Sequence, residues 1–194
     1  MKDSILQLQT LINNVHPFSA LEWNAFAEIW SPIEAKRKEI LTLAGEKEKH
    51  LFFVCEGIQR IYYLDDESRE ATIVFTYAPS FGGVLDSFLL QTKSNYFYET
   101  LTPSSFLKAS YLDFEIVMNQ FPSVEKMVRK GLTDAFSGVL HRLVELQCYS
   151  SEERFRSLLK RSPHILQLVP HRYLANYIGI DPTNFSKLIN RVKI

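Results

Sequence analysis

The spacing of apolar and polar residues divides the chain into a helical start, a middle rich in strands and a helical end. From Ile5 to Ile12 the apolar residues recur at the spacing of an amphipathic helix. Ser19 is followed three residues later by Glu22, which is the pattern of a capping box at the start of a second helix. We therefore expect two short helices before Pro32.

The apolar residues after Pro32 gather in short runs that are typical of strands. β-Branched and aromatic residues dominate these runs, and turns rich in glycine, proline or acidic residues separate them. The runs are Ile40–Leu43, Leu51–Cys55, Ile58–Leu64, Ala71–Tyr77, Tyr96–Leu101 and Phe106–Leu112. Strands at such even spacing predict an antiparallel barrel or jelly roll.

Helical spacing returns after Asp113 and predicts a long helix from Pro122 to Cys148. An apolar stripe with spacings of 4, 3, 4 and 3 runs along it, formed by Leu132, Phe136, Val139, Leu143 and Leu146. Such a helix is about 40 Å long, which exceeds the width of a small barrel. Docking on its own barrel is the commoner use of a single apolar stripe. The length favours a second copy of the helix, so we interpret the stripe as a dimer seam.

A new helix is expected just after Cys148, because Ser150 and Glu153 form a second capping box. This break suggests three parts, residues 1–121, 122–148 and 149–194. Beyond the new helix, the apolar run Ile165–Val169 is interpreted as a short strand.

The segment from His171 to Asn190 has the pattern of a helix-turn-helix. Ala175 is small where two helices would approach closely, Gly179 permits a positive φ in the turn, and Asp181 can cap the second helix. A face that is polar or basic and free of acids fits the major groove of DNA. With Arg172, the candidate DNA-binding residues on that face are Thr183, Asn184, Ser186, Lys187, Asn190 and Arg191. The alternative is an ordinary helical hairpin packed on its own domain.

Charge distribution and cysteine content indicate which partner and which cellular compartment to expect. The net charge is zero, but residues 151–194 carry eight Lys/Arg and three Asp/Glu, whereas the remaining residues have a net charge of −5. This asymmetry favours a phosphate-facing end, although an ordinary solvated surface would also account for it. Cys55 and Cys148 form no CxxC pair, there is no leader pattern, and no apolar stretch is long enough for a membrane. We expect a cytoplasmic protein without membrane contact.

Motifs spread along the chain resemble those of the Crp–Fnr family of transcriptional regulators. They are Leu43-x-Gly45, Phe53-Val54-x-x-Gly57-x-x-Arg60-x-Tyr62, Phe81-Gly82, Glu153-Arg154-Phe155 and Leu174-Ala175-x-x-Ile178-Gly179-Ile180-x-Pro182-x-x-Phe185-Ser186-Lys187. The resemblance implies an α+β fold with an N-terminal cyclic-nucleotide-binding-like jelly-roll β-barrel with flanking helices, a long dimerisation helix and a C-terminal helix-turn-helix domain. It also implies a homodimer on double-stranded DNA, with RNA polymerase as a further partner. Ser186 and Lys187 fall where the family commonly has a Ser-Arg pair touching DNA.

The sequence departs from the family at the effector site. Cyclic-nucleotide binders of the family hold the phosphate with a glycine-rich turn, an acid and an Arg-Ser pair. Here Gly83 stands where the acid is expected, and Ser94–Glu99 has no arginine to clamp a phosphate. We expect that cyclic AMP is not the effector and that a small-molecule effector, if any, is less charged. The alternative is a pocket filled by its own aromatics. The candidate effector-binding residues are Phe81, Gly82, Gly83, Val84, Leu85, Tyr96, Tyr98 and Glu99.

Other classes of protein fit less well. An iron–sulfur cluster needs about four cysteines, whereas haem ligation by a single histidine stays open. A jelly-roll metalloenzyme needs several converging histidines and carboxylates, but only His50 lies in the strand region. We therefore predict no enzyme, no metal and no cofactor. The remaining rival is a dimeric ligand-sensing or protein-interaction module whose C-terminal hairpin does not bind DNA.

Overall fold

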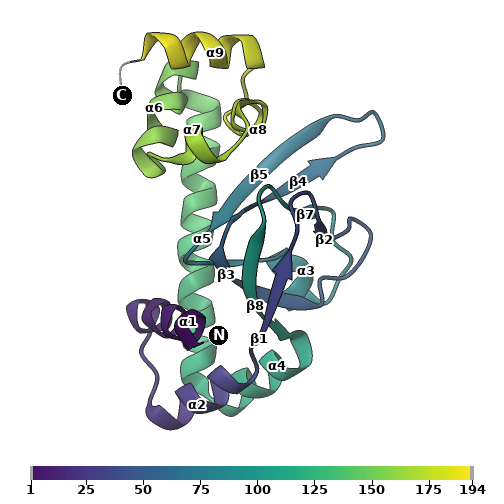
Figure 1. Cartoon of the computed structure of the whole chain (residues 1–194), viewed down its shortest axis with the longest axis vertical. Helices are drawn as coiled ribbons and strands as arrows, with labels where there is room; N and C mark the ends of the chain where they lie inside the picture. The colour runs from purple at the N-terminus through teal and green to yellow at the C-terminus, as the bar shows by residue number, and fades with distance from the viewer. Residues whose placement is uncertain (1, 193–194) are drawn as a thin grey trace.

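A computed structural model of the chain describes residues 2–192. Two antiparallel sheets of four strands each form the middle of the molecule, and a long helix runs alongside them (Figure 1). The strands are β1 (Ser31–Ala35), β2 (Ile40–Thr42), β3 (His50–Glu56), β4 (Ile58–Leu64), β5 (Glu70–Tyr77), β6 (Ser80–Gly82), β7 (Phe97–Thr100) and β8 (Ser104–Ser110). We call these two sheets the roll.

The helices lie at both ends of the roll and along one side of it (Figure 1). They are α1 (Lys2–Val15), α2 (Ala20–Glu28), α3 (Leu85–Leu90), α4 (Tyr111–Gln120), α5 (Pro122–Cys148), α6 (Ser151–Arg161), α7 (Ile165–Leu168), α8 (His171–Tyr177) and α9 (Pro182–Arg191). The two predicted capping boxes are present, at Ser19 for α2 and at Ser150 for α6. The predicted bounds of α5 are confirmed.

The two sheets have strand orders β1-β8-β3-β6 and β2-β7-β4-β5. Every strand pair in them is antiparallel, but no strand pairing joins the two sheets within residues 2–192. The predicted jelly-roll β-barrel is therefore not closed into a barrel, whereas the mixed α and antiparallel-β composition is confirmed. Of the four edge strands, β2 and β6 have only three residues each.

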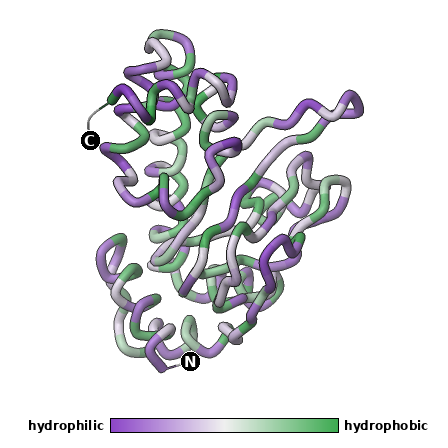
Figure 2. The backbone as a smooth tube through the Cα atoms, turned by 45° about the horizontal axis from the view of Figure 1, so that its top comes forward, coloured by the Kyte–Doolittle hydropathy of each residue, from purple (hydrophilic) through white to green (hydrophobic). Residues whose placement is uncertain are grey.

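Three hydrophobic clusters hold these layers together. One lies between the two sheets and includes Phe52, Tyr98 and Phe106. A second joins the N-terminal helices and the start of α5 to the first sheet. The third fills the C-terminal helices and also contains Ile58 and Phe75 of the roll. The hairpin β4–β5 projects from the roll toward α8 and ends in a hydrophilic tip (Figures 1 and 2).

The segment Ile165–Val169 forms α7 and its C-cap, Val169, and not the predicted strand. The Val169 N–H donates to the Ile165 carbonyl oxygen at 3.0 Å, which closes one helical turn. Both side chains are buried in the C-terminal cluster, since residues four apart lie on one face of a helix. A run this short fits either period, so its spacing could not distinguish helix from strand.

Candidate nucleic-acid interface

The turn between α8 and α9 is fixed by backbone hydrogen bonds and one glycine. The Ile180 N–H donates to the Ala175 carbonyl oxygen at 3.0 Å. Gly179 has a φ of +65°, and a Cβ there would lie 3.1 Å from Arg154 Nη1. Asp181 caps α9 by accepting from the Asn184 N–H at 2.9 Å, and this bond lowers the pKa of its carboxyl. The start and direction of α9 are therefore set by local chemistry.

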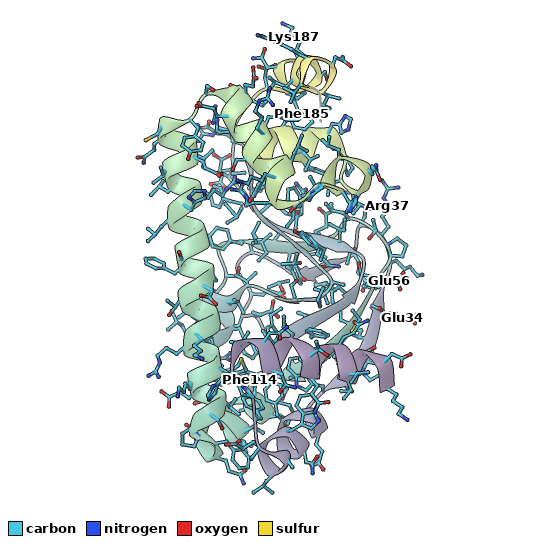
Figure 3. All side chains as sticks on the ribbon, turned by 90° about the vertical axis from the view of Figure 1, so that its left-hand side faces the viewer. Glu34, Arg37, Glu56, Phe114, Phe185 and Lys187 are labelled. Atoms are coloured by element: carbon cyan, nitrogen blue, oxygen red, sulfur yellow. The ribbon has the colours of Figure 1, made fainter. Side chains whose placement is uncertain are left out.

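The inner face of α9 is anchored by Phe185, which is fully buried. Its ring meets that of Phe155 edge-on, with centroids 5.4 Å apart. Ala175 of α8 is also fully buried, as the close approach of the two helices requires. Figure 3 shows Phe185 pointing into the C-terminal helices, while Lys187 points into solvent at the far end of the molecule.

The outer face of α9 is exposed and contains no acidic side chain. All six of the residues that the sequence places there are exposed: Thr183, Asn184, Ser186, Lys187, Asn190 and Arg191. The Ser186 hydroxyl donates to the Pro182 carbonyl oxygen at 3.0 Å, so its oxygen presents an acceptor outward. The Asn184 side-chain amide donates to Asp181, and its second N–H and its carbonyl oxygen could still pair with a base.

Arg172, the seventh candidate, lies on α8 apart from the other six. Its guanidinium donates to the Tyr173 hydroxyl at 2.6 Å. It lines a cavity of about 310 Å³ together with Glu70, Asn176 and Pro182, where α8 faces the roll. The structure therefore places Arg172 between the helical pair and the roll.

Arg60 is the centre of a buried charged cluster to which sequence reasoning gave no role. Its side chain is only 4% exposed and lies between the rings of Tyr62 and Tyr173, at 4.0 and 3.8 Å. It pairs with Glu99 at 2.8 Å and with Glu70 at 2.6 Å. Burial opposes the charge of Arg60, but the two carboxylates outweigh it and raise its pKa. The motif Gly57-x-x-Arg60-x-Tyr62 was the only signal in the sequence for this cluster.

The same cluster ties α8 to the roll. The Lys38 ammonium donates to Glu99 at 3.0 Å and to the Tyr173 hydroxyl at 2.6 Å. Beside it, the Asn176 amide donates to the Glu70 carbonyl oxygen at 2.6 Å and accepts from the Thr72 N–H. The first helix of the pair is thus hydrogen-bonded to β5 through Asn176 and to Lys38, which pairs onward with Glu99 of β7. Its Tyr173 ring also stacks on Arg60 of β4.

A second polar network joins α5 to the C-terminal helices. Arg142 stacks on the Tyr177 ring at 3.3 Å and donates to the Tyr177 carbonyl oxygen. Glu145 is buried and pairs with Arg161 of α6, whose Nη2 lies 3.0 Å from Glu145 Oε2. Burial opposes the charge of Glu145, but the hydrogen bonds from Arg161 and Ser157 lower its pKa. These contacts hold α6 and α8 at the end of the long helix.

The candidate effector residues do not gather around one open space. At the turn before α3, Gly83 has a φ of +103°, and the Val84 N–H donates to Glu48 Oε2 at 3.3 Å. Glu48 also accepts from the His50 N–H at 3.2 Å and from the Thr42 hydroxyl. A carboxylate of the chain itself therefore accepts from the Val84 N–H of this turn. Burial raises the pKa of Glu48.

Tyr98 fills the space beside Gly82. Its ring is fully buried, its hydroxyl lies 3.1 Å from Thr76 Oγ1, and a Cβ on Gly82 would clash with it. Burial also raises the pKa of the Tyr98 hydroxyl. Glu99 belongs to the Arg60 cluster, and Tyr96 packs its ring against that of Tyr63. The other two candidates, Phe81 and Leu85, line a separate apolar cavity against α5.

The apolar stripe of α5 faces solvent. Phe136 is 61% exposed and Val139 60%, and every residue from Gly131 to His141 is exposed. The middle of α5 therefore contacts little of the rest of the chain.

Neither a membrane span nor a metal cluster is found in the part of the chain that the structure describes. No helix among residues 2–192 is both long and apolar enough to cross a bilayer. These residues also form no group of three or more His, Cys, Asp or Glu that could hold a metal ion.

Comparison with known proteins identifies the fold. No family profile and no curated protein sequence matches the chain. Among solved structures, FixK2 from Bradyrhizobium japonicum matches with a TM-score of 0.73 and 13% identity over 84% of both chains. A protein from Eubacterium rectale, described as a candidate transcriptional regulator of the Crp/Fnr family, matches with a TM-score of 0.71 and 16% identity, over 91% of this chain and 86% of that one.

A third structure is CLP of Xanthomonas campestris, a global regulator responsive to c-di-GMP. It matches with a TM-score of 0.66 and 14% identity, over 89% of this chain and 91% of that one. At such identities the likeness establishes the fold alone. The chain has a Crp–Fnr-like fold, which confirms the expectation drawn from its motifs.

Proposed function

We propose that this protein is a homodimeric, sequence-specific DNA-binding transcriptional regulator of the Crp–Fnr type. The observation that carries the proposal is the exposed, acid-free outer face of α9, held out by the buried Phe185 anchor. The fold supports it, since its structural neighbours include a transcriptional regulator of that family. A regulator of this kind would act in the cytoplasm, contact RNA polymerase and have no enzymatic activity.

The chemistry of the α9 face fits the major groove. The first turn of such a helix points into the groove, so Thr183, Asn184 and Ser186 would reach base edges. Lys187 and Arg191 lie one turn apart and would bind phosphate, with guanine as a second option for Lys187. The net charge of +5 on residues 151–194 would favour approach to DNA. Arg172 would join this surface only at its edge.

The exposed stripe of α5 supports a second copy of the chain as its partner. A row of leucine, valine and phenylalanine side chains at heptad spacing is costly to leave in water. The same spacing on a two-fold-related copy would let each stripe cover the other. Pairing in this way would also place two α9 helices on one DNA duplex.

Selection from a random library of DNA duplexes tests the function. We expect enrichment of a near-palindromic site with half-sites about 34 Å apart, and binding that weakens steeply as salt is raised. If a folded, dimeric protein enriches no two-fold symmetric site, the assignment fails. Binding that is insensitive to salt would instead favour the protein-interaction module.

A further inference from the structure

An apolar cavity of about 410 Å³ lies between the roll and the first half of α5. Its walls come from α1, α4 and α5 on one side and from β3, β6 and α3 on the other. Most lining side chains are aliphatic or aromatic, among them Leu51, Phe88, Phe114 and Met127. Figure 3 labels Phe114 in this region. Cavities of about 300–1,000 Å³ with apolar walls and few polar groups are the usual form of small-molecule sites.

One polar atom in the wall of this cavity has no partner. The Ser80 hydroxyl oxygen is buried and makes no hydrogen bond to any residue that the structure describes. Burying a hydroxyl without a partner is unfavourable, so nearly all such groups in folded proteins are paired. A ligand group in the cavity would supply the missing hydrogen bond.

The α5 wall contains a glycine that the fold does not require. Gly131 lies inside a helix of 27 residues, where glycine is less favourable than alanine. A Cβ at Gly131 would meet no atom within 4 Å, and its φ is not positive. Neither close packing nor backbone conformation therefore explains glycine here. With Ala135 one turn later, it leaves room beside the apolar lining.

We propose that this cavity binds an uncharged, mostly hydrocarbon small molecule whose one hydrogen-bonding group pairs with Ser80. Asp134 is the single charged residue in the lining, and it is exposed at the rim, so nothing in the wall would neutralise an anion. The cavity is distinct from the space beside Gly83, which Glu48 fills. Leu132 belongs both to the cavity wall and to the apolar stripe, so the ligand would contact the dimer seam.

The site can be tested by measuring binding of the uncharged fluorescent dye N-phenylnaphthylamine. Because this assay contains no DNA, a failure of the proposed ligand site can be distinguished from a failure of the proposed DNA-binding function. We expect saturable binding of one dye per chain. Gly131→Leu should weaken dye binding at least tenfold, because the leucine side chain would fill the cavity. Gly138→Leu is the matched control, because Gly138 lies seven residues on, outside the lining, and also has no atom within 4 Å. Ser80→Ala should weaken binding about fivefold, as expected for one lost hydrogen bond.

Circular dichroism and light scattering of each variant check its fold and its oligomeric state. Should Gly131→Leu fail to fold, Ala135→Leu fills the same cavity from the next turn. Absence of saturable binding, or equal losses in the Gly131 and Gly138 variants, would overturn the proposal. One dye per dimer would also overturn it, because a single site shared by the two chains would then bind the dye.

Discussion

At the scale of single residues, the buried carboxyl of Glu48 makes the stability of the protein depend on pH. Its carboxylate is buried, and burial raises its pKa even though the Thr42 hydroxyl and backbone N–H groups, among them those of His50 and Val84, donate to it. A carboxyl whose folded pKa is raised holds its proton more tightly in the folded chain than in the unfolded one. Its contribution to stability is therefore full below the unfolded pKa and is lost as the pH rises through the folded pKa.

We therefore expect the free energy of unfolding of the wild type to contain a component that falls from about pH 4 upward. Glu48→Gln removes the titrating group and hence this component. Urea denaturation at a series of pH values gives the difference between wild type and variant, which should decrease as the pH rises. A difference that is constant, or that grows with pH, would contradict the assignment.

The residues of the α9 face make separable predictions. Asn184→Ala should relax sequence preference by about 1–3 kcal/mol of base discrimination while leaving non-specific binding nearly unchanged. The cap of α9 survives this change, because Asp181 accepts from the backbone N–H of residue 184. Arg191→Ala should instead lower affinity for all sequences and reduce the salt slope by about one unit. Binding titrations on selected and random duplexes at several salt concentrations compare the two variants, and identical behaviour would refute these roles.

Cyclic AMP provides a further test at this scale. The segment Ser94–Glu99 contains no arginine, Tyr98 fills the space beside Gly82, and Glu48 uses the Val84 N–H. We expect calorimetry to detect no binding of cyclic AMP at micromolar concentrations, because this segment has no arginine to compensate desolvation of the phosphate. A dissociation constant in the low micromolar range would disprove this.

At the scale of elements, the sequence predicted those features that depend only on residues close together in the chain, such as helix caps and helical periodicity. The capping boxes at Ser19 and Ser150 and the stripe of α5 lie within a few turns of helix, so spacing was sufficient. The strands β1 and β6 and the helix α3 were missed, because elements of three to six residues have too few positions to show a period. The Arg60 cluster could not be predicted, since it joins residues as far apart in sequence as Lys38 and Tyr173.

The stripe of α5 predicts a dimer that one substitution should break. Leu143→Lys would place a charge in the proposed seam at a cost of several kcal/mol. Ser137→Lys is the control, since Ser137 is exposed on the same helix but lies outside the stripe. Light scattering at micromolar concentration should find dimers for the wild type and Ser137→Lys, and monomers for Leu143→Lys. A monomeric wild type, or a dimeric Leu143→Lys, would count against the seam.

At the scale of the whole molecule, the polar contacts between α8 and the roll should contribute to stability. Asn176→Ala leaves the Thr72 N–H and the Glu70 carbonyl oxygen without their side-chain partner, which should cost about 1–3 kcal/mol. Asn190→Ala, on the exposed face of α9, should cost less than about 0.5 kcal/mol. Urea denaturation measures both changes. If both substitutions have equally small effects, the polar contacts between α8 and the roll contribute little to stability.

The hydrophobic cluster of the C-terminal helices includes Ile58, Phe75 and Leu101, which the roll contributes. A fragment that begins after α5 would consequently expose leucine, phenylalanine and tyrosine side chains that are buried in the whole chain. The segment after α5, residues 149–194, would thus not fold as an independent unit, and grafting it onto another dimerisation helix would also require the hairpin β4–β5. A substitution deep in that hairpin can change how α9 is held, although the hairpin is not part of the C-terminal helices. Gene fusions that exchange the roll between related proteins would have to keep this shared core intact.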